Sequence, residues 1–219
     1  MNMPSASREF GVTSALNCSS RSLSPSASPS RLTGTAERDN NPRPAEVNDL
    51  ETAVGGWLTG LKFSRKGGDR LKEKIADSLR IAPAKSPGEV VREIPDAIRY
   101  TFCFEPENYT DGYWDVKERL QERGHRMIYS ENHWREDPEY KGINTRWVTQ
   151  EGQRFEVQFH SRESYHAKQE VTHNSYERIR NRLTGRSERR ELEAFQREVC
   201  AWITAPVEVA SVPDYEKRD

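Results

Sequence analysis

The chain has 219 residues with a formal net charge of −1, and 33% of its residues are hydrophobic and 32% charged. This length allows one domain with a real core plus appendages, and the near-zero net charge gives no sign of general nucleic-acid affinity, so any anion site must be local. We therefore do not expect DNA as a partner. The three cysteines are too few and too scattered for a disulfide framework or a zinc site. No apolar run approaches a membrane span, so we do not expect a membrane as a partner either.

The first 45 residues are rich in Ser, Pro, Asn, Thr and Arg and poor in large apolar side chains. Such a segment buries too little apolar surface to offset its chain entropy, so we expect residues 1–45 to be disordered. No signal-peptide core follows the start. Two interpretations stay open: a dispensable tail, or a signal for secretion or injection by a route without a cleavable signal peptide, since Ser-rich polar N-termini occur on injected bacterial effectors.

Residues 47–61 space their apolar side chains as a helix does, although the glycine pair at 55–56 weakens its middle. The apolar stripe, which we expect to pack in the core, consists of Leu50, Val54, Trp57, Leu58 and Leu61.

A basic segment follows this stripe. Asp69 is expected to cap a helix that carries Arg70 and Lys74 on one face, with Lys66 just upstream. A basic helix of this kind is usually a solvated face, and the segment alone does not decide between that role and an anion site.

The next two elements are a helix and a strand. Residues 86–94 form a predicted short helix that ends near Pro95. Residues 96–104 form a predicted buried strand with Asp96 at its mouth and Arg99 three residues later.

An amphipathic helix over residues 111–123 and a strand over residues 126–132 come next. The residues expected to face inward from this helix, and the glycine expected after its last turn, are Trp114, Val116, Leu120 and Gly124.

Residues 142–148 and 154–160 are predicted to form a hairpin around the turn Glu151-Gly152-Gln153. The second strand alternates, and its apolar face would hold Phe155, Val157 and Phe159. A carboxylate, an amide and an imidazole in one row favour the floor of a cleft over an ordinary solvated face. That row consists of Arg154, Glu156, Gln158 and His160.

Ser161 is a plausible N-cap for a helix that runs to about residue 180, with Glu163 in its first turn. One face of this helix would carry His166, Glu170, His173 and Glu177. A closing helix over residues 187–203 is expected to pack in the core through Leu192, Phe195, Val199 and Trp202.

The order of these elements indicates an α+β fold, in which helices flank a mixed β-sheet. We expect one domain over residues 46–205, preceded by the disordered tail and followed by an irregular tail over residues 206–219.

Three stretches together resemble the synthetase domain of RelA/SpoT-type pyrophosphokinases, which carries a Tyr-Arg-Ser-Ile-His loop, a Glu-x-Gln-Ile-Arg-Thr strand and a helix with a terminal Glu-His. The matching stretches lie within residues 62–180. Their residues are most similar to those of the divergent branch that includes small alarmone synthetases, secreted nucleotide pyrophosphokinases and toxin domains. They are Tyr140-Lys141-Gly142-Ile143-Asn144, then Phe155-Glu156-Val157-Gln158-Phe159-His160-Ser161, then a helix with Ala167, Glu170, His173 and Tyr176.

The resemblance implies a nucleotidyltransferase-like sheet and transfer of the β,γ-pyrophosphate of ATP to the 3′-hydroxyl of a nucleotide. Asp96 and Glu156 would hold Mg²⁺, and Glu156 would also take the proton of the acceptor hydroxyl. Arg99 would stack on adenine. The cations that would neutralise the ATP phosphates are Lys66, Arg70 and Lys74.

The resemblance also implies an acceptor site. Tyr140 would stack on the acceptor base. The loop over residues 134–139 is polar and contains Pro138, and on that ground we expect it to cover the nucleotide. Ribose and phosphates would be fixed by Lys141, Asn144, Gln158, His160 and His173. Lys141-Gly142 and Asn144 depart from the family's Arg-Ser and His, so guanine specificity does not carry over, and products of the (p)ppApp and (p)ppGpp types both stay open.

The expected partners are therefore ATP and an acceptor nucleotide, and the expected place of action is the cytoplasm. An uncontrolled synthetase would drain ATP and act as a toxin or effector, with an antitoxin, immunity protein or host target left open. A different acceptor would be the tRNA 3′ end, against which the acidic residues 136–139 argue. Two hypotheses without pyrophosphate transfer also stay open: a metal-binding helix using His166, Glu170 and His173, and a non-catalytic nucleotide-binding module.

Overall fold

The computed structural model describes residues 50–51, 54–60 and 67–217, all within one compact unit, Pro42–Asp219. The expected disordered tail, residues 1–45, lies outside the described residues, and so do Leu61 and Lys66. None of the helices in the described part is long and apolar enough to cross a bilayer.

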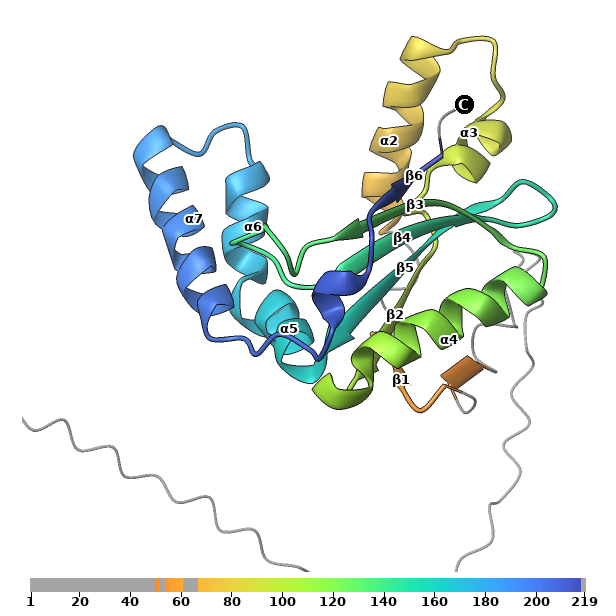
Figure 1. Cartoon of the computed structure of the whole chain (residues 1–219). Coiled ribbons are helices and arrows are strands. Elements are labelled where there is room, and N and C mark those ends of the chain that lie inside the picture. The colour runs from red at the N-terminus through yellow and green to blue at the C-terminus, as the bar shows by residue number, and fades with distance from the viewer. Residues whose placement is uncertain (1–49, 52–53, 61–66, 218–219) are drawn as a thin grey trace, which may run out of the picture. The chain divides into compact units, whose positions relative to one another are not determined.

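A six-stranded mixed sheet lies at the centre of this unit (Figure 1), with the strand order β1-β2-β5-β4-β3-β6. Strands β2 and β5 run parallel, whereas all other neighbours are antiparallel. The expected α+β fold with a helix-flanked mixed sheet is confirmed. The strands are β1 (Trp57–Thr59), β2 (Arg99–Phe104), β3 (Arg126–Asn132), β4 (Ile143–Val148), β5 (Arg154–Ser161) and β6 (Tyr215–Glu216).

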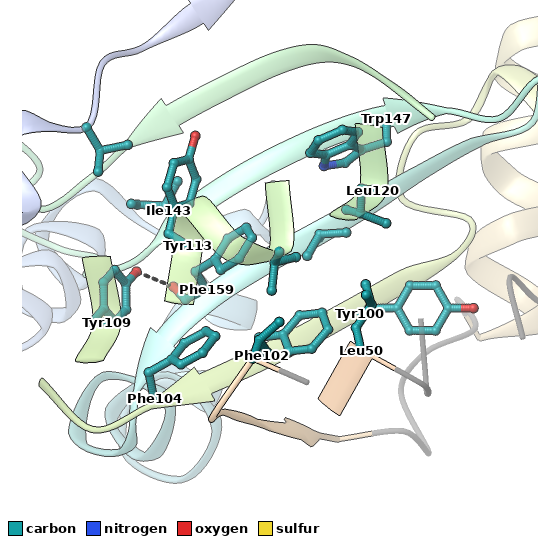
Figure 2. Close-up of a cluster of buried hydrophobic side chains, with 14 of the residues drawn as sticks. Leu50, Tyr100, Phe102, Phe104, Tyr109, Tyr113, Leu120, Ile143, Trp147 and Phe159 are labelled. Atoms are coloured by element: carbon teal, nitrogen blue, oxygen red, sulfur yellow. Dashed lines mark hydrogen bonds between the residues drawn. The ribbon is translucent and has the colours of Figure 1, made fainter. Parts of the chain in front are cut away.

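Helix α4 (Tyr109–Glu122), preceded by the short turn η2 (Pro106–Asn108), covers one face of the sheet and closes the main core (Figure 2). The predicted alternation of β5 holds on this side, because Phe155, Val157 and Phe159 are all completely buried. The hydroxyl of Tyr109 donates a 2.7 Å hydrogen bond to the carbonyl of Phe159, which fixes the start of the helix to the end of β5.

Trp114 was expected to face inward from α4, but it is 37% exposed. The buried stripe runs through Tyr109, Tyr113, Val116 and Leu120, at steps of four, three and four residues. Trp114 lies one residue off this stripe, which is why its ring remains at the surface.

Two helices precede β2 and pack on each other. Helix α2 (Gly68–Ile81) and helix α3 (Pro87–Glu93) enclose a small apolar cluster around Val90, Ile94 and Ala97. The start of α3 is a capping box, in which Ser86 and Glu89 each bond the backbone of the other.

The predicted helix over residues 47–61 is wrong at its C-terminal half. Gly55 and Gly60 have φ angles of +65° and +63°, which a continuing helix does not allow, and β1 between them pairs with β2. The apolar residues Leu50, Val54 and Leu58 still reach the core, so the burial prediction survives the change of element.

The long helix predicted after Ser161 is interrupted. Ser161 is the N-cap as expected, but helix α5 (Arg162–His166) passes into the π-helical turn η3 (Ala167–Val171), and helix α6 (His173–Arg180) starts anew. The backbone N–H of Thr172 bonds the carbonyl of Ala167 at 2.8 Å, five residues back. Each π turn adds a residue, so the expected common face of the helix is lost.

Helix α7 (Arg186–Ala201) packs on α6 and η3 rather than in the main core. Phe195 and Trp202, which were expected to be buried, are 41% and 84% exposed, whereas Gln196 and Cys200 are the buried residues of this helix. The helical period of α7 was therefore predicted correctly, but the wrong face of the helix was predicted to be buried.

The segment after residue 204, which was expected to be irregular, joins the sheet. The turn η4 (Val209–Ser211) leads into β6, which pairs with the edge strand β3. The Asn132 amide anchors it by donating to the carbonyls of Val209 at 2.7 Å and Val212 at 3.0 Å.

Replacing Gly112 by Ala should destabilise the fold by about 1–3 kcal/mol, because an added Cβ would lie 2.2 Å from the Phe104 ring in a closely packed core. Urea unfolding measures this change. Gly88→Ala is the matched control, since that helical glycine has no neighbour within 4 Å of an added Cβ, and its midpoint should stay unchanged or rise. Equal midpoints for Gly112→Ala and the parent chain would contradict the packing.

Candidate active site

A cleft of about 760 Å³ lies over the polar face of the sheet, a size that suits a nucleotide-like ligand. Its walls come from three separate parts of the chain, namely α2, the loop before β4, and the consecutive turn η3 and helix α6. Nine of the twelve predicted site residues line it, namely Arg70, Lys74, Asp96, Arg99, Tyr140, Asn144, Glu156, Gln158 and His173.

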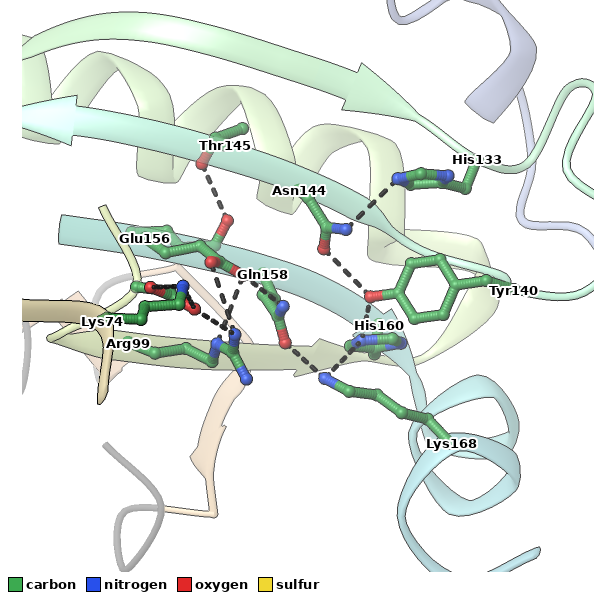
Figure 3. A network of polar contacts seen from close by, with 12 residues as sticks. Lys74, Arg99, His133, Tyr140, Asn144, Thr145, Glu156, Gln158, His160 and Lys168 are labelled. Carbon is green, nitrogen blue, oxygen red and sulfur yellow. Dashed lines mark hydrogen bonds and ion pairs between the residues drawn. The ribbon is translucent and has the colours of Figure 1, made fainter. Parts of the chain in front are cut away.

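Glu156 and Gln158 form the floor of this cleft (Figure 3), being 8% and 5% exposed. The Gln158 amide donates to the Glu156 carboxylate, and Arg99 Nε lies 3.2 Å from the same carboxylate. The parallel register places Arg99 directly opposite Glu156 on the neighbouring strand. A buried carboxylate needs such partners, and here they also fix its direction.

Lys74 and Asp96 lie at the end of the cleft nearest α2. The Lys74 ammonium is 2.7 and 2.8 Å from the two carboxylate oxygens of Asp96, and the Arg99 guanidinium is 3.9 Å from that carboxylate. Arg99 therefore lies between the Asp96 and Glu156 carboxylates. Arg70 of α2 pairs with Glu177 of α6, so this ion pair joins two walls of the cleft.

Asp96 was expected at the first position of a strand, but β2 begins only at Arg99 and Asp96 lies in the turn before it. The turn nevertheless brings its side chain to the cleft, where it is 15% exposed.

His160 was expected to contact the acceptor, but it is completely buried and does not line the cleft. Its Nε2 is 2.9 Å from the Tyr140 hydroxyl, and its Nδ1 is 2.9 Å from the Ser164 hydroxyl. Burial, together with the nearby charge of Lys168, holds the pKa of His160 well below its usual value, so the ring is neutral. His160 thus positions Tyr140.

Lys141 does not line the cleft either, because its ammonium donates a 2.6 Å bond to the backbone carbonyl of Asp137. The glycine after it has a packing reason. A Cβ on Gly142 would lie 2.9 Å from the ring of His160 and 3.0 Å from the carbonyl of Phe159. Glycine at this position therefore lets the loop approach the buried imidazole.

Hydrogen bonds and ring contacts fix the orientation of the Tyr140 ring in the cleft wall. Its hydroxyl donates to Asn144 at 2.9 Å, and the Asn144 amide lies 3.2 Å from a ring nitrogen of His133. The rings of His133 and His160 meet Tyr140 edge-on, at 4.9 and 5.4 Å between centroids. These contacts fix the aromatic plane before any ligand arrives.

The loop over residues 134–139 lies at the cleft as expected, with Asp137 and Glu139 among the lining residues. Its start is anchored by Trp134, whose indole donates to the Tyr109 hydroxyl at 3.0 Å, and its end by Glu139, which pairs with Arg197 at 2.6 Å.

Several cleft residues could not be anticipated from the sequence. Lys168 stands out among them, because it reaches Gln158 from the π-helical turn, and a lone lysine in a polar helix is usually solvated. The others with side chains that line the cleft are His133, Gln169, Thr172, Arg180 and Gln196.

The hypothesis of a metal-binding helix is not supported. Within the part of the chain that the structure describes, no three His, Cys, Asp or Glu side chains gather where they could hold a metal ion. His166 and Glu170 are exposed and do not line the cleft, because the π turn separates them from His173.

Stability should fall as the pH drops below about 6.5. The unfolded chain binds a proton at His160 near pH 6.5, whereas the folded chain does not. Below that pH, His160 therefore lowers the free energy of unfolding by up to about 1.4 kcal/mol for each pH unit. Urea unfolding between pH 7 and pH 5 measures the slope, which His160→Gln should reduce by one proton. The exposed His166→Gln should keep the parent slope. An unchanged slope in His160→Gln would contradict a neutral buried imidazole.

No protein-family model and no curated protein matches the chain. Solved structures similar to it include the Type VI effector Tas1 in complex with its immunity protein, at 19% identity, 72% of this chain, 88% of that chain and a TM-score of 0.47. The small alarmone synthetase 1 from Bacillus subtilis is 13% identical, with 71% of this chain and 82% of that chain covered and a TM-score of 0.46. A GTP pyrophosphokinase family protein from Streptococcus pneumoniae is 14% identical, with 71% of this chain and 79% of that chain covered and a TM-score of 0.45. These are structures of the type that the sequence resembles. Sequence identities and TM-scores this low do not assign an activity, so a function has to be argued from the chain's own residues.

Proposed function

We propose that the protein is a pyrophosphokinase that transfers the β,γ-pyrophosphate of ATP to the 3′-hydroxyl of an acceptor nucleotide. The observation that carries this proposal is the position of Glu156. Its carboxylate lies on the cleft floor between a cation cluster on one side and the fixed ring of Tyr140 on the other.

The donor end of the cleft suits a triphosphate. Arg70 and Lys74 come from one helix and Arg99 from the adjacent strand, and each already holds a carboxylate of the chain. Phosphate oxygens can replace those carboxylates as partners, so the cations need not be newly desolvated. Lys66, which lies outside the described residues, remains a predicted member of this group.

Asp96 and Glu156 fit a divalent cation. They are carboxylates from separate elements, both approach one guanidinium, and hard oxygen ligands are those that Mg²⁺ prefers. Bound there, Mg²⁺ would neutralise charge on the phosphates and align them.

Glu156 is the proposed base. It would take the proton of the acceptor 3′-hydroxyl, whose oxygen then forms a bond to the β-phosphorus of ATP. The bond from that phosphorus to the bridging α-oxygen breaks, and AMP leaves with the bridging oxygen. Gln158 and Arg99, which hold the carboxylate, orient it for this step.

Tyr140 provides the acceptor platform, since an aromatic face fixed from behind can stack on any purine. The acidic Asp137 and Glu139 at the cleft disfavour a polyanionic acceptor such as the tRNA 3′ end. An uncontrolled activity of this kind would drain ATP, so the proposal includes a toxin or effector role in the cytoplasm and a protein antagonist.

Labelled ATP with Mg²⁺ and equal concentrations of ATP, ADP, AMP, GTP or GDP as acceptor tests the proposal. We expect 3′-pyrophosphorylated products from adenine as well as guanine nucleotides, because stacking discriminates poorly and Gly142 offers no side chain to read a base. A chelator should abolish the reaction. Products from guanine nucleotides alone would show a base-specific contact in the loop, and the absence of any product would refute the activity.

Glu156→Gln should lower the transfer rate by at least about 10²-fold while ATP affinity and the unfolding midpoint stay near those of the parent chain. The amide keeps the shape of the side chain and one oxygen that can accept from Gln158, but it loses the charge that faces Arg99 and accepts no proton. Glu118→Gln on the exposed side of α4 is the matched control and should leave the rate unchanged. Activity within a few-fold of the parent in Glu156→Gln would remove this residue from catalysis.

A further inference from the structure

We infer that Lys168 is a substrate-binding residue that contacts the 5′-phosphate oxygens of the acceptor nucleotide. The inference rests on the proposed function and deepens it, because it adds to the acceptor end a cation that sequence patterns did not reveal.

The π-helical turn is what brings Lys168 to the cleft. It lies in η3, where both the backbone N–H and the hydroxyl of Thr172 bond the carbonyl of Ala167, at 2.8 and 3.0 Å. The hydroxyl thus reinforces a turn that is rare in proteins and frequent at functional sites. From this turn the Lys168 side chain extends over the end of β5 toward Gln158 and His160 (Figure 3).

The contacts of Lys168 are neutral. Its ammonium donates to the amide oxygen of Gln158 and lies 3.4 Å from Nε2 of His160. No carboxylate of the described residues is within ion-pair distance of it, whereas the other four cations that line the cleft each have one. Those cations are Arg70, Lys74, Arg99 and Arg180.

The charge on Lys168 therefore lacks a counter-ion in a partly buried position. Burial and the Arg99 guanidinium lower the pKa of Lys168 to about 7, against the opposing effects of Glu156 and Cys103. A cation removed from water without a paired anion is costly, and an anionic ligand in the cleft relieves that cost. A phosphate group meets this requirement and a nucleoside does not.

The residues of β5 that Lys168 contacts indicate that this lysine lies at the acceptor end of the cleft. Glu156, which faces Arg99 and the donor cations, precedes Gln158 by two residues and His160 by four, or about 7 and 13 Å along a strand. Lys168 contacts the latter two, and His160 in turn contacts the acceptor platform Tyr140. Lys141, which was predicted to bind the acceptor, bonds a backbone carbonyl instead, so Lys168 supplies the ammonium group that this end needs.

The test compares Lys168→Met with the parent chain while α,β-methylene-ATP, which cannot transfer its pyrophosphate, saturates the donor site. Calorimetry gives dissociation constants for ADP and GDP, and separately for adenosine and guanosine. We expect about 10- to 100-fold weaker binding of the two diphosphates, as for loss of one charge-assisted contact, and unchanged binding of the nucleosides. Lys117→Met, whose ammonium lies over Trp114 on α4, should leave all four constants unchanged.

Two outcomes overturn the inference. Unchanged ADP and GDP affinities in Lys168→Met would show that the ammonium does not touch phosphate. Equal losses for diphosphates and nucleosides would show that Lys168 only supports Gln158. Lys168→Arg keeps the charge and should recover part of the diphosphate affinity, and Lys168→Gln replaces the methionine variant if that one unfolds.

The same measurement separates this inference from the proposed function. Should the parent chain bind ADP and GDP but form no product, the activity is refuted while the binding constants still decide the role of Lys168. Should it bind neither diphosphate, both are refuted.

Discussion

Strands β2 and β5 run parallel at the centre of the sheet, with Arg99 opposite Glu156 and Phe102 opposite Phe159. Helix α4 covers the apolar face of β5, the other face forms the floor of the cleft, and the strand is buried from Phe155 to Ser161. A shift of one residue would turn Glu156 into the apolar core and Phe155 into the cleft. The packing of the aromatic side against α4 therefore also fixes the position of the proposed catalytic carboxylate, which cannot move without unfolding the core.

The charges in the cleft are arranged so that the donor cations are held by carboxylates of the same chain. Lys74 holds Asp96, Arg70 holds Glu177, and Arg99 lies between Asp96 and Glu156. These pairs are partly exposed, so phosphate oxygens can replace the carboxylates as partners of the cations when a ligand enters the cleft. Lys168 differs, since its partners are an amide and an imidazole, and its charge depends on what enters the cleft.

Local patterns predicted much of the fold because they act over a few residues. Strand β3 has the predicted bounds, β5 has the predicted alternation, and the short helix after Ser86 begins with its capping box. The helix expected at residues 47–61 failed because two apolar residues of β1 also fit a helical stripe, and only the left-handed glycines around it distinguish the two.

The remaining errors have a common cause, which is that tertiary contacts decided the outcome. In the π turn the backbone N–H of Thr172 bonds a carbonyl five residues back, its hydroxyl reinforces that bond, and the turn shifts every later residue of the helix. His160 and Lys141 carry polar atoms on predicted site segments, but each satisfies them inside the protein. Spacing places a residue on a face, whereas the hydrogen-bond partners decide whether it meets a ligand.

The pairing of β6 with β3 has a consequence for the nascent chain, because the two strands are made at different times. Among the described residues, strand β3 pairs with β4 on one side and with Tyr215 and Glu216 on the other, and these two residues leave the ribosome about 85 residues after β3. Until then the nascent sheet exposes unpaired backbone groups, a template for association between growing chains. The late segment is short, but Asn132 and the buried Val209 and Val212 hold it in place. The outer edge of β3 therefore stays open until residues 215–216 have been made and can pair with it.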